Sequence, residues 1–288
     1  MKKILLATTF LTLTAGAAAA EGHITWGASA AAGIASDAGG PFETYSSANL
    51  AVTLAGQTDG GLTFGATFDM TAGRSYTLGD GDTFADEEGK FGMPTVFVAG
   101  TYGKLAISDD NFDLYDDAHG GGDAEYTGTF GAVSVGLIAD VDNNVASVKL
   151  GYTAGNLALS LNADNAVNTD PLDLVADGTN EAQSNIEATY TMGTIAITAA
   201  TNQDAESSLK VAFTGANGMS ASAQYNTSDE SIDVAAGYSA NGLTVNADTN
   251  TVSNNWTVTA SYDLGGGLSV EAGTNYSEDM MIGAAMSF

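Results

Sequence analysis

From about residue 45 to the end of the chain, apolar and polar residues alternate with a period of two, and turns interrupt the alternation. The segments 62–69, 157–164 and 208–214 follow this pattern, as does 255–264. In the last of these, the apolar positions are Trp256, Val258, Ala260, Tyr262 and Leu264. Because successive side chains of a β-strand point to opposite faces, the pattern predicts strands with one apolar and one polar face.

The connections between these predicted strands also alternate in length. Very short turns, of which Asn241-Gly242 is one, are followed along the chain by longer polar or acidic segments. The longer segments fall at 72–92, 109–124 and 165–181, with shorter ones near 203, 228, 253 and 277. Strands of about 9–11 residues, with short turns at one rim and longer loops at the other, are typical of transmembrane β-barrels of bacterial outer membranes.

Aromatic residues stand at or just before the short-turn end of strand after strand. These residues are Tyr102, Phe130, Tyr152, Tyr190, Phe213, Tyr238, Tyr262 and Phe288. At a membrane–water interface such rings form a belt, whereas an ordinary soluble protein does not require them at one end of every second strand. We therefore predict a periplasmic aromatic girdle, with the core of a soluble β-sandwich as the alternative.

The predicted fold is all-β: a transmembrane antiparallel barrel with short periplasmic turns and longer extracellular loops. About eighteen strands can be counted if Glu21–Gly33 is the first, and we expect between about 16 and 18. Lipid cannot satisfy backbone N–H and C=O groups, so a spanning sheet must close on itself. A barrel of about 16 or more strands is too wide for side chains to fill, and an aqueous channel remains.

The first twenty residues differ from the rest. Lys2 and Lys3 precede an apolar stretch, and Ala18-Ala19-Ala20 offers a small-residue cleavage site before Glu21. This pattern predicts a secretory signal peptide at 1–20 and a barrel domain at 21–288. The formal net charge of −28 makes binding to nucleic acid unfavourable, and the absence of cysteine means that disulfides do not stabilise the fold.

Three segments resemble the general porins of Gram-negative bacteria, in particular the alphaproteobacterial trimeric porins. They are Leu50–Asp69 (LAVTLAGQTDGGLTFGATFD), Phe97–Asp110 (FVAGTYGKLAISDD) and Trp256–Phe288, which ends in MIGAAMSF. The resemblance implies an outer-membrane homotrimer, a third loop folded into the lumen, and passive diffusion of small hydrophilic solutes and ions. It also implies that the barrel-assembly machinery reads the terminal strand ending at Phe288. The family usually has sixteen strands and a cluster of arginines facing the loop, whereas Arg74 is the only arginine here.

If 109–124 is the third loop, its carboxylates line the constriction of the pore. They are Asp109, Asp110, Asp113, Asp116, Asp117 and Asp123, and Phe112, Leu114 and Tyr115 would pack the loop against the wall. By strand parity, further acids are also expected to face the lumen, where the bases are Lys149 and Lys210. These acids are Asp69, Glu125, Asp164, Glu187, Asp233, Asp248, Asp263 and Glu271. A confined ring of acids attracts cations, so we predict a cation-selective pore. The alternative is that the acids only keep the surface solvated.

Other chemistry has little basis in the sequence. Asp109, Asp110 and Asp113 leave open a weak Ca²⁺ site, although their spacing is not that of an EF-hand loop. No other cofactor is expected. The only histidines are His23 and His119, without serine and aspartate in a triad order, so we expect no enzyme. The alternative function is a secreted, acidic, Ca²⁺-dependent β-rich adhesin or surface protein.

Overall fold

The computed structural model describes residues 9–12, 22–78, 84–113, 121–142, 145–164 and 184–288, and the regular elements within these ranges are all β-strands. In chain order they are β1 (Thr9–Thr12), β2 (His23–Ser36), β3 (Glu43–Gln57), β4 (Thr63–Tyr76), β5 (Phe84–Phe91), β6 (Thr95–Gly100), β7 (Gly103–Asp113), β8 (Gly121–Phe130), β9 (Val133–Asp140), β10 (Val145–Ala154), β11 (Leu157–Asp164), β12 (Ser184–Met192), β13 (Ile195–Asn202), β14 (Ser207–Thr214), β15 (Met219–Asn226), β16 (Ile232–Ala240), β17 (Leu243–Asn250), β18 (Trp256–Gly265), β19 (Leu268–Asn275) and β20 (Met280–Ser287).

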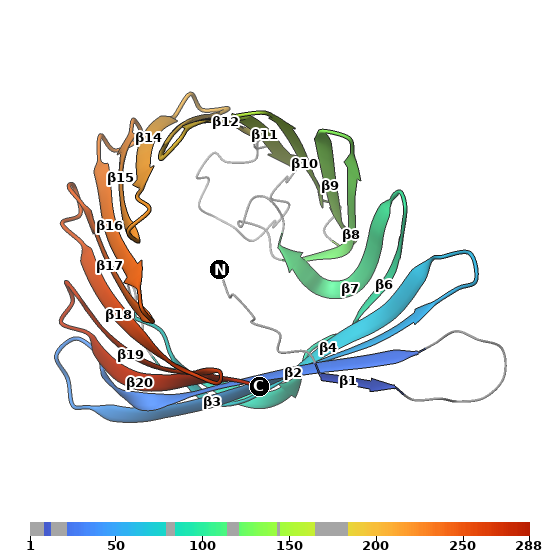
Figure 1. The fold of residues 1–288 in the computed structure, drawn as a ribbon, viewed down its shortest axis with the longest axis horizontal. Coiled ribbons are helices and arrows are strands. Elements are labelled where there is room, and N and C mark those ends of the chain that lie inside the picture. Colours follow the sequence, from blue (N-terminus) through green and yellow to red (C-terminus); the bar gives the residue numbers. More distant parts are fainter. Residues whose placement is uncertain (1–8, 13–21, 79–83, 114–120, 143–144, 165–183) are drawn as a thin grey trace, which may run out of the picture.

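The strands form one antiparallel sheet that closes into a ring (Figure 1). The closing pair is β2 with β20, in register from Ser29 opposite Ser287 to Ser36 opposite Met280. The closed barrel has 18 strands, which confirms the predicted fold class at the upper end of its expected strand number. β1 pairs with the part of β2 that extends beyond β20, and it lies inside the segment predicted to be a signal peptide.

β5 and β6 together cover one edge of β4 and act as a single interrupted strand. β6 pairs with residues 63–67 of β4, and β5 pairs with residues within 70–76. The interruption falls at 92–94, where Pro94 has no N–H to donate to the ladder. The prediction of a long loop over 72–92 is therefore wrong in extent. Polar and acidic residues remain compatible with an antiparallel strand when one of its faces meets water.

The two rims differ in the way that the sequence predicted. At one rim, connections such as 101–102, 131–132 and 241–242 contain two residues each. At the other rim the connections are longer, for example 37–42 between β2 and β3. Asn241 (φ 54°) and Gly242 (φ 82°) both have the left-handed conformation that a tight two-residue hairpin turn requires.

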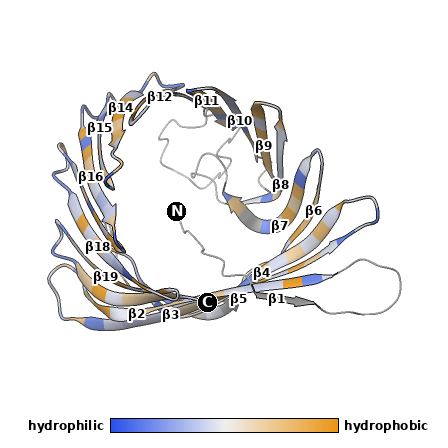
Figure 2. Ribbon diagram, in the orientation of Figure 1, coloured by the Kyte–Doolittle hydropathy of each residue, from blue (hydrophilic) through white to orange (hydrophobic). Residues whose placement is uncertain are grey.

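The exposed fractions of alternate residues show which face of the wall points outward. In β16, Ile232, Val234 and Tyr238 are exposed, whereas Asp233 and Gly237 between them are partly buried. Side chains on the concave inner face converge and shield one another, and those on the convex face spread apart. The apolar set is therefore outside and the polar set inside, and Figure 2 shows the two kinds of residue alternating along the strands. Within the described ranges, no helix is long and apolar enough to cross a membrane.

Asparagine residues end every second strand from β13 to β19, at the long-loop rim of the C-terminal half. They are Asn202, Asn226, Asn250 and Asn275. Asn250 shows the arrangement that it shares with Asn202 and Asn275: its Oδ1 accepts hydrogen bonds from the N–H groups of Val252 and Ser253, both at 2.9 Å. A side chain that satisfies its own following backbone in this way fixes the start of the connection.

The last of these connections also ties the end of the chain to its beginning. Asp279 is only 3% exposed, and its Oδ1 accepts a hydrogen bond of 2.6 Å from the N–H of Ala38. Its Oδ2 accepts a second bond, of 2.7 Å, from Nδ2 of Asn275. The 276–279 connection is thereby joined to the 37–42 connection directly above the closing β2–β20 pair.

Candidate functional site

The polar inner face of the wall carries the ionisable side chains that were predicted to line a pore. Lys149 lies opposite Gly136 and Asn162, and Lys210 lies opposite Thr198 and Gln224. Glu187 and Asp233 also fall on this inner set, between the outward apolar positions of β12 and β16. Hydroxyl pairs such as Thr189–Thr198, whose oxygens are 2.8 Å apart, separate the charged positions.

Asp233 is the most tightly held of these carboxylates. It accepts hydrogen bonds of 2.7 Å from Nδ2 of Asn226 and from Nδ2 of Asn250, one on each neighbouring strand. Glu187, by contrast, is exposed on the inner face. The inner acids thus include both carboxylates that stabilise the wall and carboxylates that meet the solvent of the lumen.

The end of β7 leaves the wall and turns into the ring, as Figure 1 shows. Phe112 packs against Ile138 and Val145, which are buried apolar residues on the inner set of β9 and β10. This contact agrees with the prediction that Phe112 holds the third loop against the wall. Leu114, Tyr115, Asp116 and Asp117 lie outside the described residues.

The predicted boundaries of this loop, 109–124, need correction. Asp109, Asp110 and Asp113 belong to β7, and Asp123 belongs to β8, because the two strands stay paired up to Asp113 opposite Gly121. A shift of register between Ile107 and Phe112 allows the pairing to continue past an irregular stretch. Asp123 accepts a hydrogen bond of 2.7 Å from the N–H of Val141, so it also fixes the connection after β9.

Two further acids are buried on the inner face beside this loop. Asp140 is 2% exposed and Asp164 is 7% exposed, and they end β9 and β11 at the long-loop rim. Ser147, which lies opposite Asp164, is 3% exposed. The sequence predicted that Asp164 faces inward. It did not single out Asp140, although Asp140 lies two residues after the inward-facing Ile138 on the same strand.

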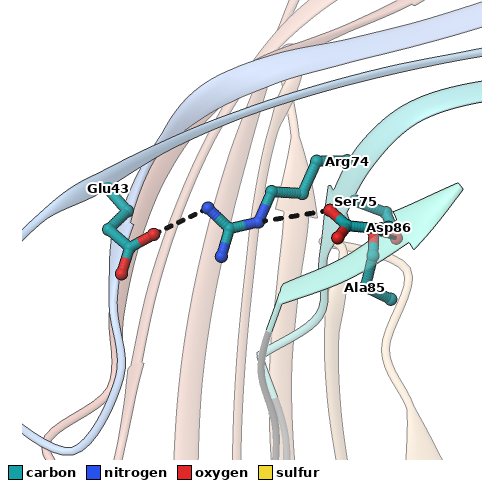
Figure 3. Close-up of polar contacts among 5 residues, drawn as sticks. All are labelled: Glu43, Arg74, Ser75, Ala85 and Asp86. Atoms are coloured by element: carbon teal, nitrogen blue, oxygen red, sulfur yellow. Dashed lines mark hydrogen bonds and ion pairs between the residues drawn. The ribbon is translucent and has the colours of Figure 1, made fainter.

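Arg74 does not oppose an acidic loop across the pore but is paired within its own part of the wall (Figure 3). Its guanidinium lies 2.6 Å from Oε2 of Glu43 on β3 and 3.7 Å from Oδ1 of Asp86 on β5. It also stacks on the ring of Phe84, 4.0 Å from the ring centroid. These contacts brace three neighbouring strands and neutralise much of the positive charge of Arg74 locally.

Lys104 is an inward-facing base that the sequence reasoning did not single out. Its ammonium lies 5.1 Å from the centroid of the Phe97 ring on β6, within the range of a cation–π contact. Lys104 and Lys149 line the same hollow of the inner wall. The alternation in β7 is enough to indicate from the sequence that Lys104 faces inward, but its proximity to Lys149 depends on the strand register.

The predicted girdle residues lie exposed at the short-turn rim. They are Tyr102, Phe130, Tyr152, Tyr190, Phe213, Tyr238, Tyr262 and Phe288. Across the ladder several of them face an aliphatic side chain that starts the preceding or following strand, as Tyr238 faces Met219 and Tyr262 faces Leu243. Trp26, which is 42% exposed near the start of β2, extends this belt and was not predicted.

The described residues contain no group of three or more histidine, aspartate or glutamate side chains arranged to hold a metal ion. The side chain of Asp110 lies outside the description, so the predicted Ca²⁺ set Asp109, Asp110 and Asp113 stays a prediction.

Comparison with known proteins identifies the family to which this barrel belongs. A family model described as Gram-negative porin matches residues 7–281. No curated protein matches the chain by sequence.

Solved structures of porins share the fold. A triple mutant of Rhodopseudomonas blastica porin is 16% identical, with a TM-score of 0.55 over 92% of this chain and 100% of that chain. Another mutant of the same Rh. blastica porin is 14% identical, with a TM-score of 0.55 and the same coverage. This chain belongs to the Gram-negative porin family, whose members form diffusion channels in the outer membrane.

Proposed function

We propose that the barrel is a water-filled channel through which small hydrophilic solutes and ions diffuse passively, with a preference for cations. The observation that carries the proposal is the excess of acids on the inner face. Among the described residues, the inner acids include Asp69, Glu125, Asp140, Asp164, Glu187, Asp233, Asp248, Asp263 and Glu271, against the inner bases Lys104, Lys149 and Lys210. Fixed charge in a confined pore concentrates counter-ions, and the effect strengthens as salt is lowered.

The test is the reversal potential of the purified protein in a planar bilayer with a KCl gradient. We expect the sign that corresponds to K⁺ passing more readily than Cl⁻, and a larger value at low ionic strength than at high. A reversal potential of the opposite sign would refute cation selectivity without refuting the channel itself, because the conductance is measured in the same recording.

Two variants distinguish the effect of charge in the lumen on the reversal potential from the effect of the total charge of the protein. Glu187 and Asp248 face inward, and within the described part of the chain neither carboxylate has a hydrogen bond that E187Q or D248N would remove. The combined variant should move the reversal potential toward zero. D59N, in the short turn between β3 and β4, removes a charge at the rim rather than on a strand of the wall, and should change the reversal potential much less.

Processing and assembly of the chain can be proposed on the same basis. We propose that residues 1–20 are cleaved before Glu21, and that the mature chain associates as a homotrimer in outer-membrane lipid. We also propose that the barrel-assembly machinery recognises β20 through Phe288, which is 60% exposed. Amino-terminal sequencing tests the cleavage, and crosslinking in detergent tests the trimer. Deletion of Phe288 should lower the yield of folded barrel.

The proposed activity is diffusion, so it requires neither catalysis nor a cofactor. The alternative, a secreted Ca²⁺-dependent adhesin, would remain in the aqueous phase. The band of exposed apolar side chains around the barrel instead favours extraction by detergent only.

A further inference from the structure

The chain that leaves β4 covers the inner face of the barrel where the first and last strands of the ring meet. Leu78, two residues after the end of β4, reaches Gly273 on β19, where a Cβ atom added to the glycine would lie 2.5 Å from Cδ2 of Leu78. β3, β2 and β20 lie between these two strands in the wall. Gly273 belongs to the inner set of β19, since Val270 and Ala272 on the other set are exposed. The segment 76–78, which we call the seam strap, therefore crosses the lumen side of the closing strands.

The strap turns into the lumen because the alternation of β4 is broken just before it. Ala72 is exposed on the outer set of β4, and strict alternation would send Tyr76 outward as well. Gly73, however, has a φ of 103°, and the register of β4 with β5 shifts between Thr71 and Gly73. An irregularity of this kind re-aims the side chains that follow it. The ring of Tyr76 accordingly lies 5.9 Å from the ring of Tyr45, which is on the inner set of β3.

The wall under the strap is shaped to receive it. The hydroxyl of Tyr76 donates a hydrogen bond of 3.2 Å to the backbone oxygen of Ser36 at the end of β2. The hydroxyl of Tyr45 lies over Gly33 and Gly283, which face each other in the closing pair, and a Cβ atom at Gly33 would come within 2.7 Å of it. Glycine at these inner positions leaves the space that rings folded onto the wall require.

The strap shields this part of the wall from the lumen. Ala35 is 0% exposed and Tyr45 is 6% exposed, although both lie on the inner face of the strands that close the barrel. Inner residues of the uncovered wall, such as Thr198 on β13 and Ser222 on β15, keep partial exposure. The difference shows that the segment lies against the wall rather than extending from the rim.

The strap lies across the ring from the inward-turned end of β7. Phe112 covers Val145 at the start of β10, and Leu78 covers Gly273 near the end of β19, so both contacts are close to the long-loop rim. β19 is nine steps from β10 along the sheet, which is half of the 18-strand ring. Figure 1 shows these two strands on opposite sides of the lumen. The lumen is thus narrowed from two opposite sides near the same rim.

We propose that the seam strap is the second lip of the pore constriction, and that it helps to set the size of solute that passes. The inference rests on the proposed channel function. Thr77 is exposed between Tyr76 and Leu78, whose side chains both contact the wall, so Thr77 is the strap residue that meets the solute. The third loop alone does not define the opening, because the wall opposite it is itself covered.

The experiment measures single-channel conductance of T77C in planar bilayers before and after reaction with a cationic or an anionic methanethiosulfonate reagent. The natural chain contains no cysteine, so only the introduced thiol reacts. S222C is the matched control, since Ser222 is an inner residue of β15 that neither the strap nor Phe112 covers. Mass spectrometry confirms complete modification, and heat-modifiable migration on gels confirms that each variant is folded.

Both reagents should lower the conductance of T77C more than that of S222C, because an added group of the same size blocks a larger share of a narrowed opening. L78A removes the contact with Gly273, and G273A places a methyl group where Leu78 now lies. Each should loosen the strap and raise the conductance of the unmodified channel.

Two results would overturn the second lip. One is an equal loss of conductance in fully modified T77C and S222C, and the other is an unchanged conductance in both L78A and G273A. A wild type that does not conduct at all refutes the channel, whereas a conducting wild type with either of these results refutes only the role of the strap.

Discussion

Replacement of Asp279 by alanine should weaken the junction at which the barrel closes. The side chain is 3% exposed and accepts one bond from Ala38 N–H at 2.6 Å and one from Asn275 Nδ2 at 2.7 Å. A hydrogen bond to a charged group contributes about 1.5–3 kcal/mol, and a buried donor left without an acceptor carries a desolvation cost. Ala38 lies in an exposed connection, where water can replace the lost acceptor. We therefore expect D279A to lower the free energy of unfolding by about 2–4 kcal/mol rather than by the full sum.

The assay is urea unfolding in lipid vesicles, followed by tryptophan fluorescence and by the heat-modifiable migration of folded barrels on gels. D279N retains one acceptor oxygen but turns an amide nitrogen toward one of the two donors, so its loss should be intermediate. E278Q removes a charge from the neighbouring, exposed position and should leave the unfolding midpoint unchanged. If D279A and E278Q unfold at the same urea concentration, Asp279 does not hold the seam, and the reasoning from its two hydrogen bonds is wrong.

Three further outcomes follow from contacts elsewhere in the barrel. R74Q removes the ion pairs and the ring contact that join β3, β4 and β5, so amide hydrogens of β5 should exchange faster while those of β16 do not change. F213A removes an exposed girdle ring and should cost about 1–2 kcal/mol of unfolding free energy in lipid, whereas S222A on the inner face should cost less than about 0.5 kcal/mol. Hydrogen bonds from the Ser231 hydroxyl and N–H lower the pKa of Asp229, so its small contribution to loop order is present above the ordinary carboxyl pKa and is lost as pH falls through the lowered value. S231A should raise the pKa of Asp229 in an NMR titration, and an unchanged value would contradict this assignment.

The pattern of side chains was sufficient to predict the barrel because every level of the sequence agrees with it. Alternation such as that of β16 fixes which residues share a face, and two-residue turns such as Asn241-Gly242 fix the hairpin register. The girdle positions follow from the same two signals, since an aromatic residue one or two positions before a short turn must lie at the rim. These features are local, and no long-range contact is needed to infer them.

The loops and the ion pairs depend on contacts that the sequence does not display. The acidic stretches 72–92 and 109–124 have the composition of loops, yet strand pairing extends into both because their polar side chains meet water on at least one face. The partner of Arg74, Glu43, is 31 residues away and becomes its neighbour only through the register of β3 with β4. Likewise, Lys104 and Lys149 share a hollow only because two intervening strands align them in one row.

The charges of the lumen are unequal in number, and acids and bases are interleaved along the strands. Asp140 and Asp164 end their strands at the long-loop rim, whereas the row that contains Lys104 and Lys149 lies closer to the short-turn rim. A solute entering from the long-loop side therefore passes these two acids before it reaches the lysine row. Asp164 is nonetheless the diagonal neighbour of Lys149, and Glu125 is the diagonal neighbour of Lys104. Because the Debye length is about 10 Å at about 0.1 M salt, a solute at this depth meets acids and bases together. The proposed cation preference therefore follows from the excess of acids over bases in the lumen as a whole, and not from charges at separate depths.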